Sequence, residues 1–305
     1  MSRAHGALWR ALLGAVLLAG VVWLTNPAQV WAQLRLVDMS WLLLGLSTAV
    51  ASNVVSALRW RILARWLDLG LGPINALRWY FQAIGLNTLL PGAVVGGDVY
   101  RVWMLRANGA SVSAASLVVI FDRISGLWIL CALGGVGAVL CAPTLAPWLG
   151  WSTSGFVLLV LLATAAWLAL AYMLPRLPVN RMPRRLGALH VIFQKHDYIQ
   201  QLNMQALLST AVQLLSAAAL AAGALALGVR QPPAVWIFVS APIFLMAALP
   251  VSVGGWGTRE AAAVAALAPF AVAPATAVGV GLIYGVYALA QGALGALAFG
   301  LPRHR

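Results

Sequence analysis

Charged residues are scarce in this chain. Asp, Glu, Lys and Arg make up 8% of its 305 residues, whereas a soluble domain carries about 25%. Hydrophobic residues account for 63%, and the mean hydropathy is +0.92. A soluble core could not cover that much apolar surface. The composition therefore excludes a soluble globular protein and indicates an integral membrane protein.

Strict alternation of apolar and polar residues is also missing. The apolar segments run well beyond ten residues, which favours membrane-spanning helices over a barrel of strands. No stretch is long or polar enough to form a separate soluble domain. We predict an all-α, polytopic helical bundle that forms a single transmembrane domain over residues 1–305.

Cysteine and histidine are too few and too scattered to indicate a disulfide framework or a metal site. Cys131 and Cys141 both lie in an apolar segment, and the four histidines fall at positions 5, 190, 196 and 304, outside the predicted spans. No P-loop, nucleophile elbow or metal-spaced His/Cys cluster occurs. We therefore expect no cofactor and no metal.

An enzyme is disfavoured for the same reasons, although an intramembrane transferase that uses Asp98 or Glu260 as a base stays open. In a soluble protein, the net charge of +13 would suggest nucleic-acid binding. Here no basic run with interleaved aromatics supports that interpretation. The expected partners are the bilayer and an anionic lipid, with lipid-pathway enzymes also open.

Nine apolar segments provide the candidate membrane elements. They fall at roughly 7–24, 39–58, 77–96, 111–142, 151–174, 205–228, 234–253, 261–273 and 276–300. A single crossing takes about 20 residues. The segments at 77–96 and 234–253 each end in Pro and Gly, and 261–273 is too short to span alone. We predict six full spans plus two re-entrant broken-helix hairpins, with eight full spans as the alternative.

The basic residues orient the spans through the positive-inside rule. We place the basic clusters near both termini, after the second span and between the fifth and sixth segments in the cytoplasm. These clusters comprise Arg3, Arg10, Arg59, Arg61, Arg65, Arg176, Arg181, Arg184, Arg185, Lys195, Arg303 and Arg305. The two hairpins then enter from opposite faces of a bacterial plasma (inner) membrane, with both termini cytoplasmic.

Two polar or basic stretches leave alternatives open. Residues 175–204 could form an amphipathic helix on the cytoplasmic surface or an ordinary linker. At the N-terminus, "VWA" at 30–32 resembles a signal-peptidase site. We favour a first span that is retained over one that is cleaved.

One short motif appears twice. The pattern V-G-G-x-x-x-R stands at 95–101 and again at 253–259. Two copies of a broken-helix element that enter from opposite faces are typical of inverted-repeat transporters, whose binding site lies where the broken helices meet. This favours pseudo-repeat halves at about 39–174 and 205–305. The alternative is that Pro-Gly simply ends a helix at the interface.

Three acidic residues next to arginines stand out because charge inside a membrane is costly. Asp98 and Arg101 are three apart and can pair on a helix. Asp122 and Arg123 point about 100° apart on a helix, so each should meet another element. Glu260 directly follows Arg259. These residues predict either a functional site or an ion-pair network that pins the bundle, and the two interpretations are compatible.

The same stretches resemble a known family. "NTLLPGAVVGGDVYR" (87–101), "VVIFDRISGLWIL" (118–130) and "LPVSVGGWGTREAA" (249–262) are similar to the lysylphosphatidylglycerol synthase transmembrane-region family, also described as flippase-like. The resemblance covers nearly the whole chain. One departure is Asp122, where glutamate is more usual.

The resemblance implies the membrane half of such a synthase, which moves the lipid between leaflets. In full-length synthases a soluble domain transfers lysine from its tRNA to phosphatidylglycerol, and we expect a stand-alone member without that domain. Because stand-alone members belong to different lipid pathways, the substrate does not carry over.

We therefore predict a membrane lipid translocase for an anionic phospholipid or polyprenyl-phosphate lipid. The alternatives are a membrane enzyme that transfers a sugar or aminoacyl group to a lipid, or an accessory subunit. We expect four glycines to admit the head group, three arginines to receive its phosphate and three acids to hold the arginines. The full set of predicted substrate-binding residues is Asn87, Pro91, Gly92, Gly96, Gly97, Asp98, Arg101, Asp122, Arg123, Pro250, Ser252, Gly254, Gly255, Gly257, Arg259 and Glu260.

Overall fold

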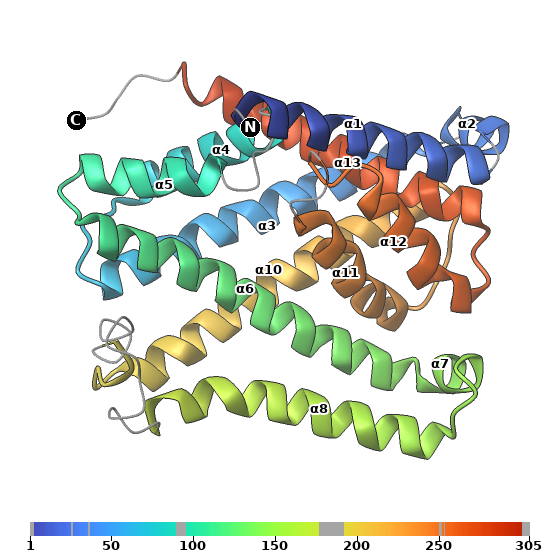
Figure 1. Cartoon of the computed structure of the whole chain (residues 1–305). Coiled ribbons are helices and arrows are strands. Elements are labelled where there is room, and N and C mark those ends of the chain that lie inside the picture. The colour runs from blue at the N-terminus through green and yellow to red at the C-terminus, as the bar shows by residue number, and fades with distance from the viewer. Residues whose placement is uncertain are drawn as a thin grey trace.

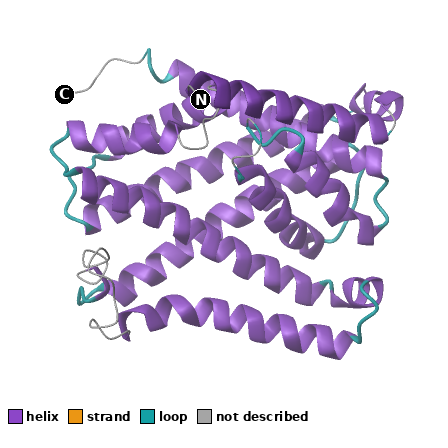
Figure 2. Cartoon of the chain, viewed as in Figure 1, coloured by secondary structure: helices purple, strands orange, loops and turns teal. Residues whose placement is uncertain are grey.

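A computed structural model describes residues 3–25, 27–35, 37–89, 96–176, 192–249, 252 and 254–300. Within these ranges the regular structure is helical, without strands, as predicted (Figure 2). The α-helices are α1 (Arg3–Leu24), α2 (Pro27–Arg35), α3 (Met39–Trp66), α4 (Pro73–Leu89), α5 (Gly96–Ala107), α6 (Val112–Leu140), α7 (Ala142–Trp148), α8 (Thr153–Met173), α10 (Tyr198–Ala226), α11 (Pro233–Ala248), α12 (Thr258–Leu267) and α13 (Pro274–Leu297). Two 3₁₀ turns, η1 (Leu174–Arg176) and η4 (Ala268–Phe270), complete the described elements.

Five helices are long and apolar enough to cross a bilayer: α3, α6, α8, α10 and α13. A sixth candidate is the pair Ala15–Leu24 and Pro27–Arg35, which bends by 91°. This number agrees with six spans plus two hairpins better than with eight spans. Side-chain caps set where three of the long helices begin, because Asp38, Ser111 and Ser152 each accept a backbone N–H from the first turn that follows.

The two predicted hairpins are present and open toward opposite ends of the bundle (Figure 1). The first consists of α4 and α5, and the second of α11 and α12, with the two helices of each in contact. The helices α4 and α11 contain 17 and 16 residues. At 1.5 Å per residue each is about 25 Å long, which is shorter than the roughly 30 Å hydrocarbon core. The tip of the first hairpin, residues 90–95, lies outside the described residues.

The order long helix, hairpin, long helix occurs twice, as α3, α4–α5, α6 and as α10, α11–α12, α13. The contacts repeat as well. The long helices α3 and α10 pack against each other, α6 packs on α11 of the second hairpin, and α13 packs on α4 of the first. Each hairpin is therefore held by the last long helix of the other set. The helix α8 packs on the outside of α6, and most of its surface is exposed.

Small residues allow the close helix contacts. The Ser52 hydroxyl lies 2.8 Å from the Ser216 hydroxyl where α3 crosses α10. A Cβ added at Gly295 of α13 would lie 2.1 Å from the carbonyl oxygen of Phe81 in α4. Without hydrophobic expulsion from water, membrane helices depend on such close van der Waals packing.

Candidate functional site

Five charged side chains from α3, α5 and α6 form one connected group, which we call the arginine–aspartate cluster. Its members are Arg59, Asp98, Arg101, Asp122 and Arg123. Asp122 is at its centre, with 1% of its surface exposed. Its Oδ1 accepts from Nε and Nη2 of Arg59 at 3.0 and 2.9 Å, and its Oδ2 accepts from Nη1 of Arg101 at 2.8 Å.

Arg101 links the two aspartates. Its Nη2 donates to Oδ1 of Asp98 at 2.7 Å, which is the predicted pair three residues apart on α5. The guanidinium also lies over the rings of Trp60 and Tyr80, with 5.3 and 5.1 Å to the ring centroids. Charge, hydrogen bonds and cation–π contacts thus offset the cost of burying this arginine, which is 2% exposed.

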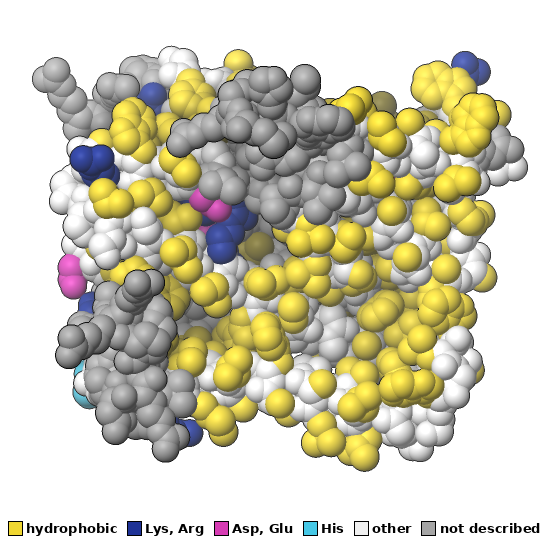
Figure 3. Space-filling view, viewed as in Figure 1, with side chains coloured by type: hydrophobic (Ala, Val, Ile, Leu, Met, Phe, Trp, Pro, Cys, Tyr) yellow, Lys and Arg dark blue, Asp and Glu magenta, His cyan; other side chains and the backbone are white. Residues whose placement is uncertain are grey.

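Arg123 is the exposed member of the cluster. It donates from Nε and Nη2 to Asp98, and its side chain is 51% exposed. The residue is the twelfth of the 29 residues of α6, which places it about 16 Å along a helix of about 43 Å. Figure 3 shows acidic and basic side chains together in the middle of a largely hydrophobic face. Through Arg123, the cluster therefore reaches the outer surface of the bundle at a point far from the ends of α6.

Two hollows meet at Arg123. A groove of about 390 Å³ runs between α5 and α6, with Asp98, Val102 and Ile120 in its wall. A second cavity, of about 320 Å³, lies inside the bundle among α3, α6, α10 and α11. Arg123 lines both, whereas Asp122 lines the second. We call these the lateral groove and the inner cavity.

The inner cavity is unusually polar for a membrane interior. Its wall includes Ser52, Asn53, Ser56, Gln213 and Ser216, and Phe244, Leu245 and Ala248 contribute from α11 near the tip of the second hairpin. The cavity therefore lies between the arginine–aspartate cluster and the second hairpin. Its hydroxyl and amide groups can solvate a polar ligand.

The first hairpin is closed by Asn87. Its Oδ1 accepts the backbone N–H of Gly97 at 2.8 Å, which satisfies one of the free donors at the beginning of α5. A Cβ on Gly97 would lie 2.4 Å from the carbonyl oxygen of Ala83. Glycine is thus required at this close approach. Asp98 lies in the first turn of α5, where the helix dipole favours a carboxylate.

The second hairpin carries a separate ion pair. Nε of Arg259 donates to Oε1 of Glu260 at 3.0 Å, and Oε2 of Glu260 accepts the backbone N–H of Gly257 at 2.6 Å. The two side chains are 3% and 0% exposed. Gly254, Gly255 and Gly257 have φ values of +60°, +76° and +83°, a region that favours glycine.

The predicted residues fall into four groups. Asp98, Arg101, Asp122 and Arg123 come together in the first cluster, and Asp122 and Arg123 each meet another helix, as their directions on α6 required. Arg259 and Glu260 pair with each other, and no ion pair among the described residues joins them to the first cluster. Gly96 begins α5, and Ser252 contacts the Thr258 hydroxyl at 3.1 Å. Pro91, Gly92 and Pro250 lie outside the described residues.

One site residue was assigned a different role. The sequence predicts Arg59 after the second span, among the cytoplasmic residues that set the topology. It lies instead within α3, 4% exposed, and donates to Asp122 and to the Ser209 hydroxyl. The charge of Arg59 interrupts the apolar run, so the predicted span ended at residue 58. Its partner is 63 residues away, and local sequence carries no sign of it.

Part of the chain is similar in sequence to known membrane proteins. A region of 113 residues is 27% identical to a UPF0104 membrane protein of Methanothermobacter thermautotrophicus, covering 37% of this chain and 33% of the relative. A region of 115 residues is 24% identical to the UPF0104 membrane protein PH1989 of Pyrococcus horikoshii, covering 37% and 34%. The match thus spans about a third of each of these relatives.

A family model gives much wider coverage. The model described as the lysylphosphatidylglycerol synthase TM region matches residues 11–295. That range includes both hairpins and both ion-pair groups described above. The chain is therefore a multi-pass membrane protein that belongs to the lysylphosphatidylglycerol synthase transmembrane-region family.

Proposed function

We propose that this protein binds an anionic lipid, a phospholipid or a polyprenyl phosphate, and moves it between leaflets. The observation that carries the proposal is the position of Arg123, at the junction of the lateral groove and the polar inner cavity. A head group that enters sideways from the bilayer meets this guanidinium first. The lipid tails can stay against the hydrophobic outer surface while the head group passes inward.

The charge balance of the cluster favours an anion. Three arginines face two aspartates, which leaves a formal charge of +1. Asp98 engages Nε and Nη2 of Arg123, and Nη1 has no hydrogen-bond partner among the described residues. A phosphate can bind this free amino group and then compete with Asp98 for the rest of the guanidinium. Asp98 thus keeps Arg123 in place and limits its affinity, so that the anion can leave again.

The distribution of basic residues favours one orientation in the membrane. Among the described residues, more basic side chains lie at the end where the first hairpin opens than at the opposite end. The first end carries Arg61, Arg65, Arg78, Arg106, Arg176 and Lys195, and the opposite end carries Arg35 and Arg230. Under the positive-inside rule the first end faces the cytoplasm. We propose that the protein lies in a bacterial inner membrane, with the first hairpin entering from the cytoplasm and the second from outside.

The experiment is a leaflet-exchange assay with purified protein in liposomes. Fluorescent phosphatidylglycerol is compared with fluorescent phosphatidylcholine, and a membrane-impermeant quencher reports which leaflet holds the probe. The wild type should accelerate exchange of the anionic probe. Arg123→Gln should reduce that rate at least about tenfold, the effect of losing one charge-assisted contact of roughly 1.5–3 kcal/mol.

Arg106→Gln serves as the matched control, because Arg106 is an exposed arginine in α5 outside both hollows. It should exchange the probe at the wild-type rate. Equal rates for wild type and Arg123→Gln would remove Arg123 from the site. A wild-type protein that moves no lipid from a panel of anionic probes would contradict the translocase and favour the accessory subunit.

A further inference from the structure

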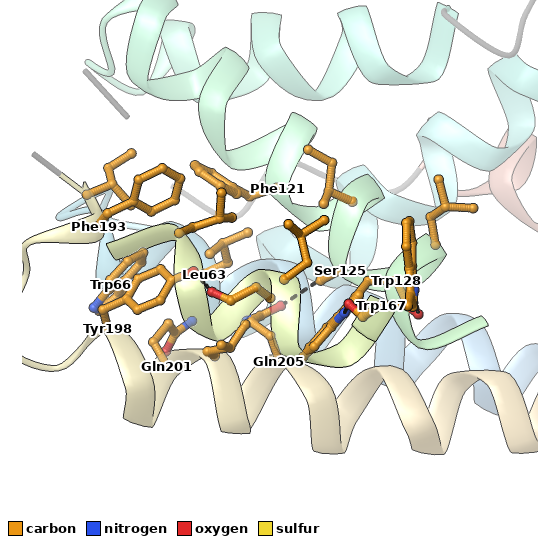
Figure 4. Close-up of a pocket in the computed structure, with 17 residues that line it drawn as sticks. Leu63, Trp66, Phe121, Ser125, Trp128, Trp167, Phe193, Tyr198, Gln201 and Gln205 are labelled. Atoms are coloured by element: carbon orange, nitrogen blue, oxygen red, sulfur yellow. Dashed lines mark hydrogen bonds between the residues drawn. The ribbon is translucent and has the colours of Figure 1, made fainter. Parts of the chain in front are cut away.

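A third hollow lies against α6, in addition to the lateral groove and the inner cavity. It has a volume of about 180 Å³ and is lined by α3, α6, α8, α10 and the residues just before α10. Figure 4 shows side chains from these elements converging on it. We call it the apolar pocket. An apolar cavity of about 150 Å³ is large enough to hold benzene, so this one can hold a segment of a hydrocarbon chain.

The apolar pocket opens on the hydrophobic surface. Ile124, Leu127 and Leu170 line it, yet they are 53%, 44% and 55% exposed. In a membrane, the molecules in contact with that opening are lipids. The pocket also adjoins the proposed head-group path, because Ile124 lines the lateral groove as well and Leu127 lines the inner cavity as well.

Within the described part of the chain, two buried donors in the pocket have no hydrogen-bond partner. The other polar groups of its wall are satisfied, since the indoles of Trp128 and Trp167 each donate to the other residue's carbonyl oxygen, and Tyr198 donates to the carbonyl oxygen of Ala171. Trp66 Nε1 and Gln201 Nε2 are buried and have no hydrogen-bond partner among the residues that the structure describes. Each such donor costs about 1–3 kcal/mol, a cost that a ligand with an oxygen acceptor would remove.

The unpaired donors lie at one end of the pocket, where Figure 4 shows Trp66, Tyr198 and Gln201 together. A cation is close to that end. Nζ of Lys195 lies 5.2 Å from the centroid of the Trp66 ring and donates to the backbone carbonyl of Trp66 at 2.6 Å. The same Nζ forms an ion pair with Asp68 at 3.3 Å, which balances its charge. The pocket thus has an apolar body and a donor-rich end.

We propose that the apolar pocket holds one hydrocarbon chain of a membrane lipid, with an oxygen of that lipid accepting from Trp66 and Gln201. The pocket and the lateral groove share a wall, so the same lipid occupies both, with its head group at Arg123. This last step rests on the proposed translocase function. The pocket then anchors one chain while the head group is held at the cluster.

Photolabelling tests occupancy without measuring transport. The full chain is reconstituted in vesicles of phosphatidylethanolamine and phosphatidylglycerol that contain a trace of phosphatidylglycerol with a diazirine on one acyl chain. After illumination, mass spectrometry locates the labelled peptides. Labels are expected on the segments that contain Phe121 and Tyr198. A wild-type protein that carries no label on either segment would overturn the proposal.

Ala171→Trp fills the pocket from α8 and should remove these labels. Ala166→Trp is the matched control, since Ala166 is an exposed alanine of the same helix outside the pocket, and it should label as the wild type does. Gln201→Leu removes one unpaired donor. It should weaken labelling about three- to tenfold, the effect of one hydrogen bond, without lowering the melting temperature. Gln200→Leu, at an exposed position of α10, should change neither.

The leaflet-exchange assay on the same variants separates the two proposals. Loss of both labelling and exchange in Ala171→Trp, with both retained in Ala166→Trp, supports one lipid bridging pocket and groove. Lost labelling with wild-type exchange would overturn that bridging and leave a structural lipid. Labelling of a wild type that exchanges no lipid would contradict the translocase while supporting the pocket as a lipid site. A lower melting temperature for Gln201→Leu would contradict the role of its amide as a ligand donor.

Discussion

The two hairpins share the V-G-G-x-x-x-R pattern but use its arginine differently. Arg101 of the first hairpin reaches from α5 to Asp122 of α6, which in turn holds Arg59 of α3. Arg259 of the second hairpin pairs with Glu260, the next residue of its own helix. One arginine therefore connects three helices, and the other stays within a single helix.

This difference suggests that the two copies of the motif have different roles. A local, neutral pair that also caps α12 through Gly257 stabilises the hairpin, and both of its partners come from one helix. A network that spans three helices and carries a formal charge of +1 can gain a ligand and can change when those helices move. We infer that the second pair stabilises the fold and that the first cluster binds the anion.

The largest effect should come from Asp122→Ala. This change leaves the guanidinium groups of Arg59 and Arg101 buried without their shared counterion. Breaking a buried pair on one side costs about 3–5 kcal/mol. Glu260→Ala leaves one buried arginine without its counterion instead of two, so it should lower the free energy of unfolding by less. Thermal unfolding in detergent, followed by tryptophan fluorescence, measures both.

Replacing both partners gives the control for this prediction. Arg259→Leu with Glu260→Leu removes the whole second pair, and such replacements are often neutral or stabilising. The variant also loses the cap on the N–H of Gly257, which costs about 1 kcal/mol. Arg59→Leu with Asp122→Leu still leaves Arg101 without its buried partner. The first double variant should therefore unfold near the wild-type temperature and the second well below it. Equal losses of melting temperature in the two double variants would mean that both ion-pair groups connect the helices to the same extent.

The spans and hairpins were predictable because they depend on local properties. Twenty apolar residues in a row indicate a crossing, and Pro followed by Gly indicates a break, so 77–96 and 234–253 stood out as irregular. The predicted limits were less accurate. The sequence predicts that the second span ends at residue 58, but α3 continues to Trp66. The continuation depends on neutralising Arg59, and the carboxylate that does so comes from a distant helix.

The candidate site was predictable to the same degree. The Asp98–Arg101 pair follows from a spacing of three on one helix, and the cross-helix contacts of Asp122 and Arg123 follow from their directions on α6. Arg59, Trp60 and Tyr80 were missed as partners because only the packing of α3 and α4 against α5 and α6 brings them near. The sequence therefore indicates which charged residues contribute to the site, but not which residues on other helices are their partners.

A smaller effect is expected from Gly285→Ala, which tests how tightly the second pair is enclosed. A Cβ at this position of α13 would lie 2.3 Å from Nη2 of Arg259 and 2.7 Å from the Trp256 ring. Overpacking of this kind costs about 1–3 kcal/mol. The expected result is a lower melting temperature with unchanged preference for the anionic probe in surviving protein. Gly20→Ala, with nothing within 4 Å of its added Cβ, should not lower the melting temperature.

The smallest effect should come from Asn87→Ala, which removes the acceptor that closes the first hairpin. The lost hydrogen bond to the N–H of Gly97 is worth about 0.5–1.5 kcal/mol. This bond fixes the beginning of α5, and α5 holds Asp98 and Arg101, so a small loss of stability should accompany a larger relative loss of anionic-lipid exchange. Thr88→Ala is the control, because the Thr88 hydroxyl donates only within its own helix, to the carbonyl of Ile84. Equal exchange by the two variants would show that the cluster does not need a fixed hairpin, because its ion pairs to α3 and α6 would then suffice to position Arg101.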